Sequence, residues 1–164
     1  MVLVITKKML SHRPTFEVSV GVVLFLMPEN KPQFLLLRYP HGHWDFVKGH
    51  VEKGENEKET LKRELFEEAG IQDIAILKGF REEVRFRYTA KGTEKEKRQQ
   101  KGKGLYIWKK VIYYAAQTKE TRIELSDEHL DWAWLSYEDA RKKITHRNSR
   151  AVLDNAMKCI DKKD

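Results

Sequence analysis

Three glutamates in the run RELFEEAG, at positions 64, 67 and 68, are the residues whose spacing best suits chemistry. On a helix that turns about 100° per residue, spacings of three and four place Glu64, Glu67 and Glu68 on one arc. Like charges this close repel one another, so a bound cation would make the cluster tolerable. Carboxylate oxygens suit Mg²⁺ or Mn²⁺, and protein-bound magnesium commonly also binds substrate phosphates. The cluster predicts a metal site for a phosphate-bearing substrate, with a solvated acidic helix face as the alternative.

A helix over residues 57–69 is expected to carry these glutamates. Asn56 and Glu59 have the spacing of a capping box, and Gly70 suits the left-handed residue that ends a helix. The apolar stripe beside the glutamates consists of Leu61, Leu65 and Ala69. The carboxylates are therefore expected at the edge of the buried helix face.

The segment GHVEKGENEKETLKRELFEEAGI, residues 49–71, resembles the Nudix box at every fixed position. The matching residues are Gly49, Glu55, Arg63, Glu64, Leu65, Glu67, Glu68, Gly70 and Ile71. The resemblance implies an α/β fold of the Nudix type, an α/β/α sandwich with a mixed β-sheet. It also implies metal-dependent hydrolysis of a nucleoside diphosphate linked to another group.

The same resemblance implies roles for individual residues. Glu64, Glu67 and Glu68 would bind Mg²⁺, or Mn²⁺, together with the carbonyl of Gly49. Glu64 is also the preferred general base for the attacking water. Arg63 would orient the carboxylates, and the remaining acidic residue of the pattern, Glu55, would brace the loop.

Two flanking runs narrow the resemblance. HWDFVKGHVEKGE (43–55) and the later run over residues 111–140 are similar to segments of the diadenosine tetraphosphate hydrolases. This similarity implies asymmetric cleavage of diadenosine tetraphosphate to ATP and AMP. It also implies that His43 and Lys48 contact the phosphate chain.

Three more residues are assigned by the same similarity. Tyr113 and Trp132 would stack on adenine, and Glu128 would be an extra metal ligand or base. Each residue also has an alternative without a role in the reaction: Tyr113 as a core residue, Trp132 as a surface residue and Glu128 as a capping acid. Because Trp132 and Trp134 alternate along a strand, we expect Trp134 to face the core.

Two features depart from that subfamily. Val47 stands where a proline usually precedes the lysine, which removes a constraint on the backbone. The run AKGTEKEKRQQKGKG (90–104) is long and basic and has no apolar period, so it predicts an extended, mobile hairpin loop. Two interpretations of this loop remain: a solvated tip, or a basic flap that covers a phosphate. Lys110, with its neighbour Lys109, is better placed than the loop to reach a phosphate.

The remaining pattern indicates strands and helices in one unit, without internal repeats. Strands are expected over 15–27, 31–38, 74–80, 82–88, 105–117 and 132–135. Further helices are expected over SYEDARKKI, opened by Ser136, and over NSRAVLDNAMKCI, capped by Asn148 or Ser149. We predict a single domain over residues 1–164.

Composition restricts the class of protein. The 164 residues carry 32 lysines and arginines against 25 acidic residues, a net charge of +7 that favours an anionic partner or a heat-adapted surface. The single cysteine excludes a disulfide framework and a cysteine-based zinc site. No apolar run is long enough for a membrane helix, and the N-terminal run MVLVITKKML lacks signal-peptide features. We expect a cytoplasmic protein without a membrane or an obligate protein partner.

Several substrates remain open. The expected substrate is a small nucleotide polyphosphate, and the main alternative is the triphosphorylated 5′ end of RNA. ADP-ribose and nucleoside triphosphates are further alternatives. A non-catalytic nucleotide- or RNA-binding module is the alternative of a different class, although no carboxylate of the box is missing.

Overall fold

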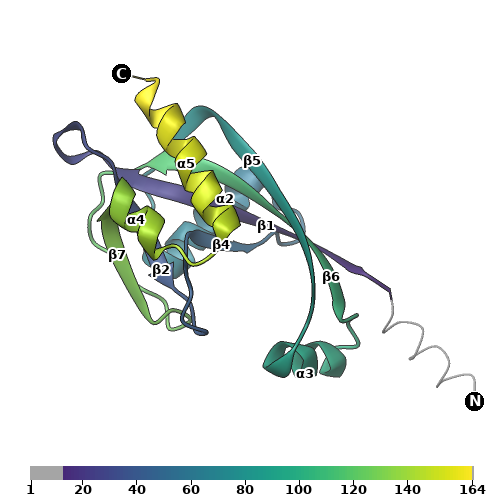
Figure 1. Cartoon of the computed structure of the whole chain (residues 1–164). Coiled ribbons are helices and arrows are strands. Elements are labelled where there is room, and N and C mark those ends of the chain that lie inside the picture. The colour runs from purple at the N-terminus through teal and green to yellow at the C-terminus, as the bar shows by residue number, and fades with distance from the viewer. Residues whose placement is uncertain (1–12, 164) are drawn as a thin grey trace, which may run out of the picture.

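The computed structural model describes residues 13–163 and contains one seven-stranded mixed sheet (Figure 1). The central strand β1 runs parallel to β6, and the other pairs are antiparallel. The strands are β1 (Thr15–Leu26), β2 (Gln33–Arg38), β3 (Trp44–Asp45), β4 (Val47–His50), β5 (Ala75–Thr89), β6 (Tyr106–Gln117) and β7 (Asp131–Ser136). The mixed sheet predicted from the sequence is confirmed. The N-terminal run for which we predict no signal-peptide function lies outside the described residues.

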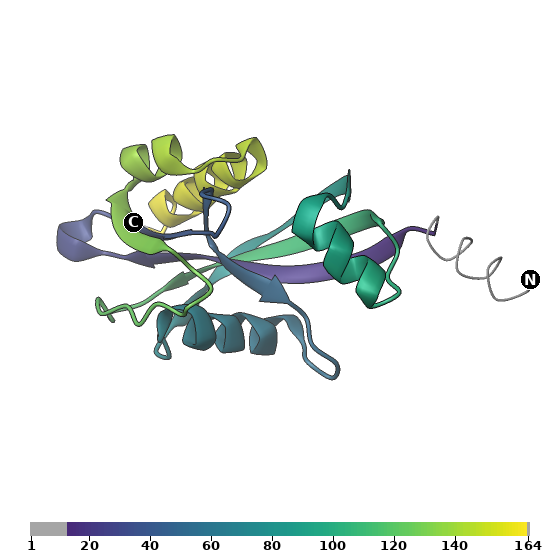
Figure 2. The same cartoon turned by 90° about the horizontal axis from the view of Figure 1, so that it is seen from below.

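Helices cover both faces of the sheet, as Figure 2 shows. Helix α2 (Glu57–Ala69) packs on one face, and α4 (Tyr137–Lys143) and α5 (Arg147–Asp161) pack on the other. A short 3-10 turn, η1 (Pro28–Asn30), joins β1 to β2. Alternate residues of β1 supply the two cores, with Val22 facing α2 and Val23 facing α5. The predicted α/β/α sandwich is confirmed.

The local signals for α2 act as predicted. The side chain of Asn56 accepts a hydrogen bond from the Glu59 amide, and the Glu59 carboxylate accepts one from the Asn56 amide. Gly70 ends the helix in the left-handed region at φ 71°. The buried Leu61 and Leu65 hold α2 against the sheet, so the orientation of its glutamates relative to the sheet is fixed.

Two boundaries differ from the sequence prediction. The expected strands over 74–80 and 82–88 form one strand, β5, with an irregularity in its register between Ile76 and Arg81. Helix α5 starts at Arg147, so Asn148 and Ser149 lie in its first turn and do not cap it. The reason is an anchor just before the helix, where Trp44 and Thr145 exchange two hydrogen bonds of 2.9 and 3.2 Å. Ser136 caps α4 as predicted, by accepting a hydrogen bond from the Asp139 amide.

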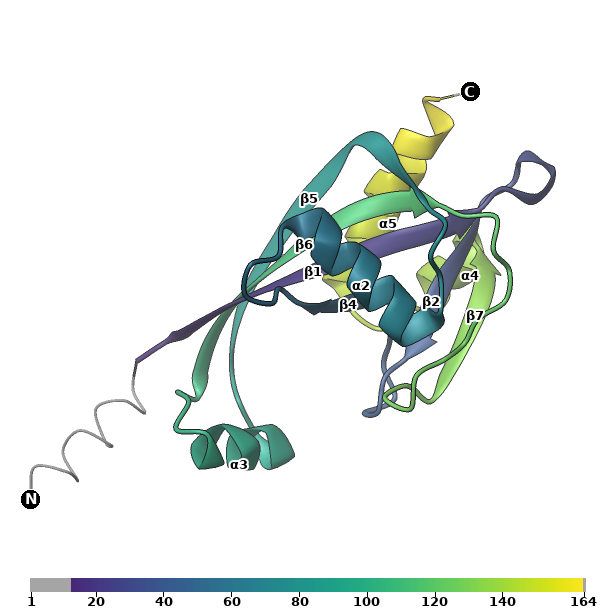
Figure 3. The same cartoon turned by 180° about the vertical axis from the view of Figure 1, so that it is seen from behind.

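The prediction of an extended, mobile loop over residues 90–104 is wrong, because this run contains helix α3 (Gly92–Gln100). Polar contacts explain the helix better than apolar periodicity. Arg98 is 7% exposed, donates to Glu17 at 2.6 Å and donates to the Gly104 carbonyl at 2.8 Å. Helix α3 sits at the far end of the long β5–β6 hairpin, away from α2 and α5 (Figure 3). Within residues 13–163, no helix has the length and apolar character to cross a membrane.

Candidate active site

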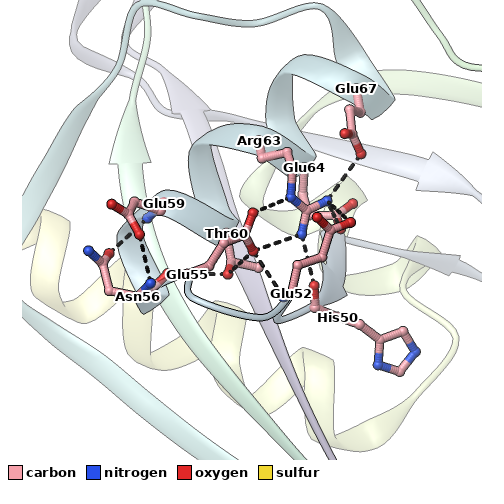
Figure 4. Close-up of polar contacts among 9 residues, drawn as sticks. All are labelled: His50, Glu52, Glu55, Asn56, Glu59, Thr60, Arg63, Glu64 and Glu67. Atoms are coloured by element: carbon pink, nitrogen blue, oxygen red, sulfur yellow. Dashed lines mark hydrogen bonds and ion pairs between the residues drawn. The ribbon is translucent and has the colours of Figure 1, made fainter.

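Arg63 is the centre of the polar network on the exposed edge of α2 (Figure 4). Its Nε donates to Glu55 Oε1 at 2.5 Å, and its Nη1 donates to Glu64 Oε1 at 2.7 Å and to Glu67 Oε2 at 3.1 Å. Its Nη2 donates to the His50 carbonyl at 2.9 Å. One guanidinium therefore connects the loop after β4 with two of the three clustered glutamates.

Glu55 is held in its ionised form by this network. Hydrogen bonds from Arg63 lower the pKa of Glu55 to about 2, and a hydrogen bond from Thr60 adds to the effect. Glu55 also accepts a hydrogen bond from the Glu52 amide at 3.0 Å. These contacts fix the loop before α2, which is the bracing position that the resemblance implies.

Glu64 lies directly against the backbone of Gly49. A Cβ atom at Gly49 would stand 1.9 Å from Glu64 Cδ, so only a glycine leaves room for this carboxylate. Burial raises the pKa of Glu64 above its usual value of 4.5, Arg63 opposes the rise, and Glu68 and Glu67 add to it by repulsion. Glu64 is thus a crowded, partly desolvated carboxylate against the backbone of Gly49.

Glu68 has the least compensated charge of the cluster. It is 6% exposed, and its Oε2 has no hydrogen-bond partner among residues 13–163. His129 Nε2 lies 3.3 Å from Glu68 Oε1, and the His129 ring packs edge-on against Tyr39 at 4.6 Å between centroids. A buried carboxylate oxygen without a partner is costly unless a cation or water satisfies it.

These residues fit a divalent cation by donor chemistry. Glu64, Glu67, Glu68 and the Gly49 carbonyl offer hard oxygen atoms, and Glu68 Oε2 lacks a partner in the described chain. Nowhere in residues 13–163 do three acidic or histidine side chains already surround a common point at ligand distances. The contacts explain this, because Glu67 points to Arg63 and not to Glu68. A bound cation would therefore require Glu67 to exchange its arginine for the metal.

A second group of side chains lies next to β4 and is linked to Glu68 through Tyr39, which packs against the α2-side core and contacts His129. Lys48 Nζ lies 2.5 Å from Oδ2 of the buried Asp45 and 5.6 Å from the centre of the Tyr39 ring. The His43 ring stacks on the Tyr39 ring, with 4.7 Å between the ring centroids and 13° between the ring planes. Burial lowers the pKa of His43, and Lys48 lowers it further. His43 and Lys48, both predicted to contact phosphate, are thus brought together by Tyr39.

A cavity of about 410 Å³ opens beside Lys48. Its other lining residues include Asp45, Phe86, Tyr113 and the first turn of α5. The Tyr113 ring crosses Gly21, where an added Cβ would stand 2.6 Å from the ring and 3.3 Å from Lys48 Cβ. Tyr113 is only 3% exposed and belongs to the core cluster, so it forms a wall of the cavity.

The remaining predicted residues lie elsewhere. Glu128 is exposed in the loop before β7, next to the buried His129. Trp132 is 38% exposed on β7, whereas Trp134 packs against the α2-side core, as expected. The expected alternation is wrong, because residues two apart on a strand share a face, and both tryptophans lie opposite α2-side leucines of β2. Lys110 lines a different cavity with Trp108, on the α2 side of the sheet, while Lys109 shares the face of Tyr113. Their roles stay predictions.

Three residues of the site were not singled out from the sequence. Asp45 and Tyr39 pair with Lys48, and His129 contacts Glu68. The run SDEHL, where His129 follows Glu128, was an available signal for the histidine. Nothing in the sequence marks Tyr39, since its role depends on three segments that meet only in the fold.

Comparisons with known proteins agree with this geometry. Residues 15–155 match the family model of the NUDIX domain. The asymmetrical bis(5′-nucleosyl)-tetraphosphatase of Mus musculus is 37% identical over 145 residues, which cover 81% of this chain and 88% of the mouse protein. An RNA pyrophosphohydrolase of Shewanella pealeana is 33% identical over 108 residues, which cover 61% of this chain and 60% of that protein.

The fold agrees with a solved structure of a related protein. The binary complex of the Caenorhabditis elegans Ap4A hydrolase superposes with a TM-score of 0.67 at 31% identity. The match covers 84% of this chain and 93% of that chain.

Proposed function

Because the chain belongs to the NUDIX family of hydrolases, we propose that it cleaves a phosphoric anhydride bond of diadenosine tetraphosphate asymmetrically, giving ATP and AMP. The observation that carries the proposal is the set of carboxylates on α2, with Glu64 against Gly49 and Glu68 lacking a partner. The choice of substrate is supported by the mouse relative, which is matched over 88% of its length and is named for this activity.

Nudix hydrolases generally use divalent metal ions, and in this proposal the ion is Mg²⁺, with Mn²⁺ as the alternative. Glu64, Glu67, Glu68 and the Gly49 carbonyl would hold it. The ion would neutralise phosphate charge and lower the pKa of the attacking water. The side chains around it then decide how the substrate and the water are oriented.

Each residue has its own role in the hydrolysis. Glu64, whose pKa is raised by burial, accepts a proton from the attacking water. The water oxygen forms a new bond to one phosphorus atom while the bond from that phosphorus to the bridging oxygen breaks. The two products leave as AMP and ATP. Arg63 keeps Glu64 and Glu67 in position, as its two hydrogen bonds to them support. Glu128 remains a proposed extra ligand or base.

The side chains around Lys48 and Tyr39 would hold the rest of the substrate. Lys48 would exchange Asp45 for a phosphate, and His43 would donate a hydrogen bond to the chain. Tyr113 would contact a nucleoside from the wall of the cavity. Trp132 and Lys110 are proposed as outer contacts for the second nucleoside and its phosphate.

Removal of pyrophosphate from triphosphorylated RNA is the second candidate. The Shewanella relative supports it over part of the chain, and the basic surface around α3 favours a polyanionic substrate. We also propose one domain over residues 1–164 that works in the cytoplasm without an obligate protein partner. Gel filtration and cell fractionation test these last points.

The deciding experiment is a substrate panel assayed with Mg²⁺ and with Mn²⁺. The panel contains diadenosine tetraphosphate, nucleoside triphosphates, ADP-ribose and a 5′-triphosphorylated RNA, with products separated by ion-exchange chromatography. We expect ATP and AMP in equal amounts from diadenosine tetraphosphate and no turnover in EDTA. A higher kcat/KM for RNA would replace the first candidate with the second. Absence of turnover with every substrate would contradict both.

A further inference from the structure

A second cavity, of about 630 Å³, lies between α3 and the strands β1, β4 and β6. Cationic side chains dominate its lining. They are Lys97, Arg98, Lys101, Lys103 and Lys109, and His50 also lines the cavity. The carboxylates in the lining are Glu17 and Glu94. The cavity thus has an excess of positive charge and suits an anion.

The two carboxylates of the lining pair with Arg98, so they leave the lysines unpaired. Glu17 accepts a hydrogen bond from Arg98 at 2.6 Å, and Glu94 lies 3.8 Å from Arg98 Nη1 and accepts a hydrogen bond from the Tyr88 hydroxyl at 2.9 Å. Lys97, Lys101 and Lys103 are exposed, and the ion pairs among residues 13–163 include none of them. Three ammonium groups are therefore free to bind a ligand.

Arg98 provides an independent sign of a missing acceptor. The side chain is 7% exposed and is anchored through Nε and Nη1, whereas Nη2 has no hydrogen-bond partner among the described residues. A buried guanidinium nitrogen without an acceptor is unfavourable. An oxyanion or its bound water in the cavity would supply one.

Lys109 is a partly buried cation of the same lining. Burial lowers the pKa of Lys109, Glu17 and Glu94 oppose this fall, and Lys48 and Arg98 add to it. Lys109 lies on the same face of β6 as Tyr113, which lines the cavity beside Lys48. A bound anion would stabilise the charged form of Lys109.

The cavity also begins next to the candidate metal site. His50 lines it and directly follows Gly49, and the His50 carbonyl accepts the hydrogen bond from Arg63 at 2.9 Å. We infer that the cavity under α3 is a second phosphate-binding site, which holds a phosphate group of the nucleotide chain beyond the anhydride bond that is cleaved. The identity of that chain rests on the proposed function, whereas the anion site itself does not.

Two substrates could supply this phosphate: a dinucleoside polyphosphate with a longer chain, or the backbone of an RNA whose 5′ end is in the active site. The ligand chemistry is the same in both. Kinetics with the two substrates separate them, and binding of an inorganic probe tests the site without turnover.

The binding experiment uses inorganic tripolyphosphate, the full chain and EDTA, with isothermal titration calorimetry. The cavity variant carries Lys97→Gln, Lys101→Gln and Lys103→Gln, and the charge-matched control carries Lys91→Gln, Lys95→Gln and Lys119→Gln, all at exposed lysines outside the cavity. We expect the cavity variant to bind on the order of tenfold more weakly than the control, because each exposed ion pair contributes a few-fold. Equal binding by the two variants, with loss only in Lys48→Gln, would overturn the inference.

The kinetic experiment measures KM of the cavity variant and of the control variant for diadenosine tetraphosphate, diadenosine hexaphosphate and a 5′-triphosphorylated RNA. If KM of the cavity variant is raised at unchanged kcat for the hexaphosphate alone, the ligand is a polyphosphate. If KM is raised for the RNA alone, the ligand is the RNA backbone. Unchanged KM for all three, in an active enzyme, would overturn the inference. Lack of turnover by the wild-type chain would instead contradict the proposed function, and the tripolyphosphate result would still decide the anion site. Circular dichroism confirms that the variants are folded.

Discussion

Arg63 on α2 and Arg98 on α3 are both held by carboxylates, but their partners come from very different parts of the chain. Arg63 binds Glu64, one residue away, Glu55, eight residues away, and the His50 carbonyl, 13 residues away. Arg98 binds Glu17, 81 residues away, in addition to the nearby Gly104 carbonyl and Glu94. A network of near neighbours produces a fixed sequence spacing that can be recognised. A contact with a distant strand leaves no such spacing, so α3 resembles a loop in the sequence.

The largest expected effect is a loss of kcat on changing a carboxylate of α2. Glu64→Gln should lower kcat by about 10²–10⁴-fold, because a carboxamide cannot accept the proton from water. The unfolding midpoint should stay equal or rise, because the charged form of Glu64 is disfavoured by burial. Steady-state kinetics and thermal unfolding check the two results.

Glu59→Gln is the matched control for this variant, because glutamine preserves the capping box of the same helix. Its kcat should stay near that of the wild-type chain. Equal losses in both variants would show that the effect comes from the helix and not from the site.

Arg63→Lys should have the next largest effect. Lysine keeps the positive charge but cannot bridge Glu55, Glu64 and the His50 carbonyl at once. We expect kcat to fall about 10- to 100-fold. Urea unfolding should show a loss of about 1–3 kcal/mol, from hydrogen bonds to charged groups.

Arg81→Lys provides the contrast, because Arg81 forms a similar pair with Glu57 away from the clustered glutamates. It should lose stability while keeping kcat within a few-fold. If Arg63→Lys kept full activity, Arg63 would have no role in positioning the carboxylates.

On the α3 side, Arg98→Gln should act locally. The change leaves Glu17 without its main partner and should destabilise α3 by about 1–3 kcal/mol. Hydrogen exchange should become faster at the amides of α3 and stay unchanged at those of α2. Lys95→Gln, on the exposed side of α3, should alter neither set of amides. Faster exchange in both helices would contradict the separation of the two regions.

The smallest effect concerns pH and Glu55. Its pKa is about 2 in the folded chain against 4.5 as the usual value, so its ion pair stabilises the fold fully above about pH 4.5. This contribution is lost as the pH falls towards 2. The difference in unfolding free energy between the wild-type chain and Glu55→Gln should therefore shrink over this range. Urea unfolding at several pH values measures it, and a difference that stayed constant down to pH 2 would exclude the arginine as the cause.

Much of the fold followed from local patterns. The capping box at Asn56 and the ending at Gly70 are confirmed, since each depends on neighbours in the chain. The start of α5 could not be predicted, because Thr145 is anchored by Trp44, 101 residues away. The registers of the strands also remained hidden, so the sequence did not separate the side of Lys109 from the side of Lys110.

Local spacing along the chain specified how the acidic residues of α2 are arranged. Glu64, Glu67 and Glu68 lie within about one helical turn, so their mutual positions follow from the helix period. The surroundings of these glutamates depend on the folding of distant segments. It placed His129 beside Glu68, joined Tyr39 to Lys48 and folded α3 over a cationic cavity. The physical reason is that these contacts join distant segments whose separation is fixed by strand register and packing, and local spacing carries no record of either.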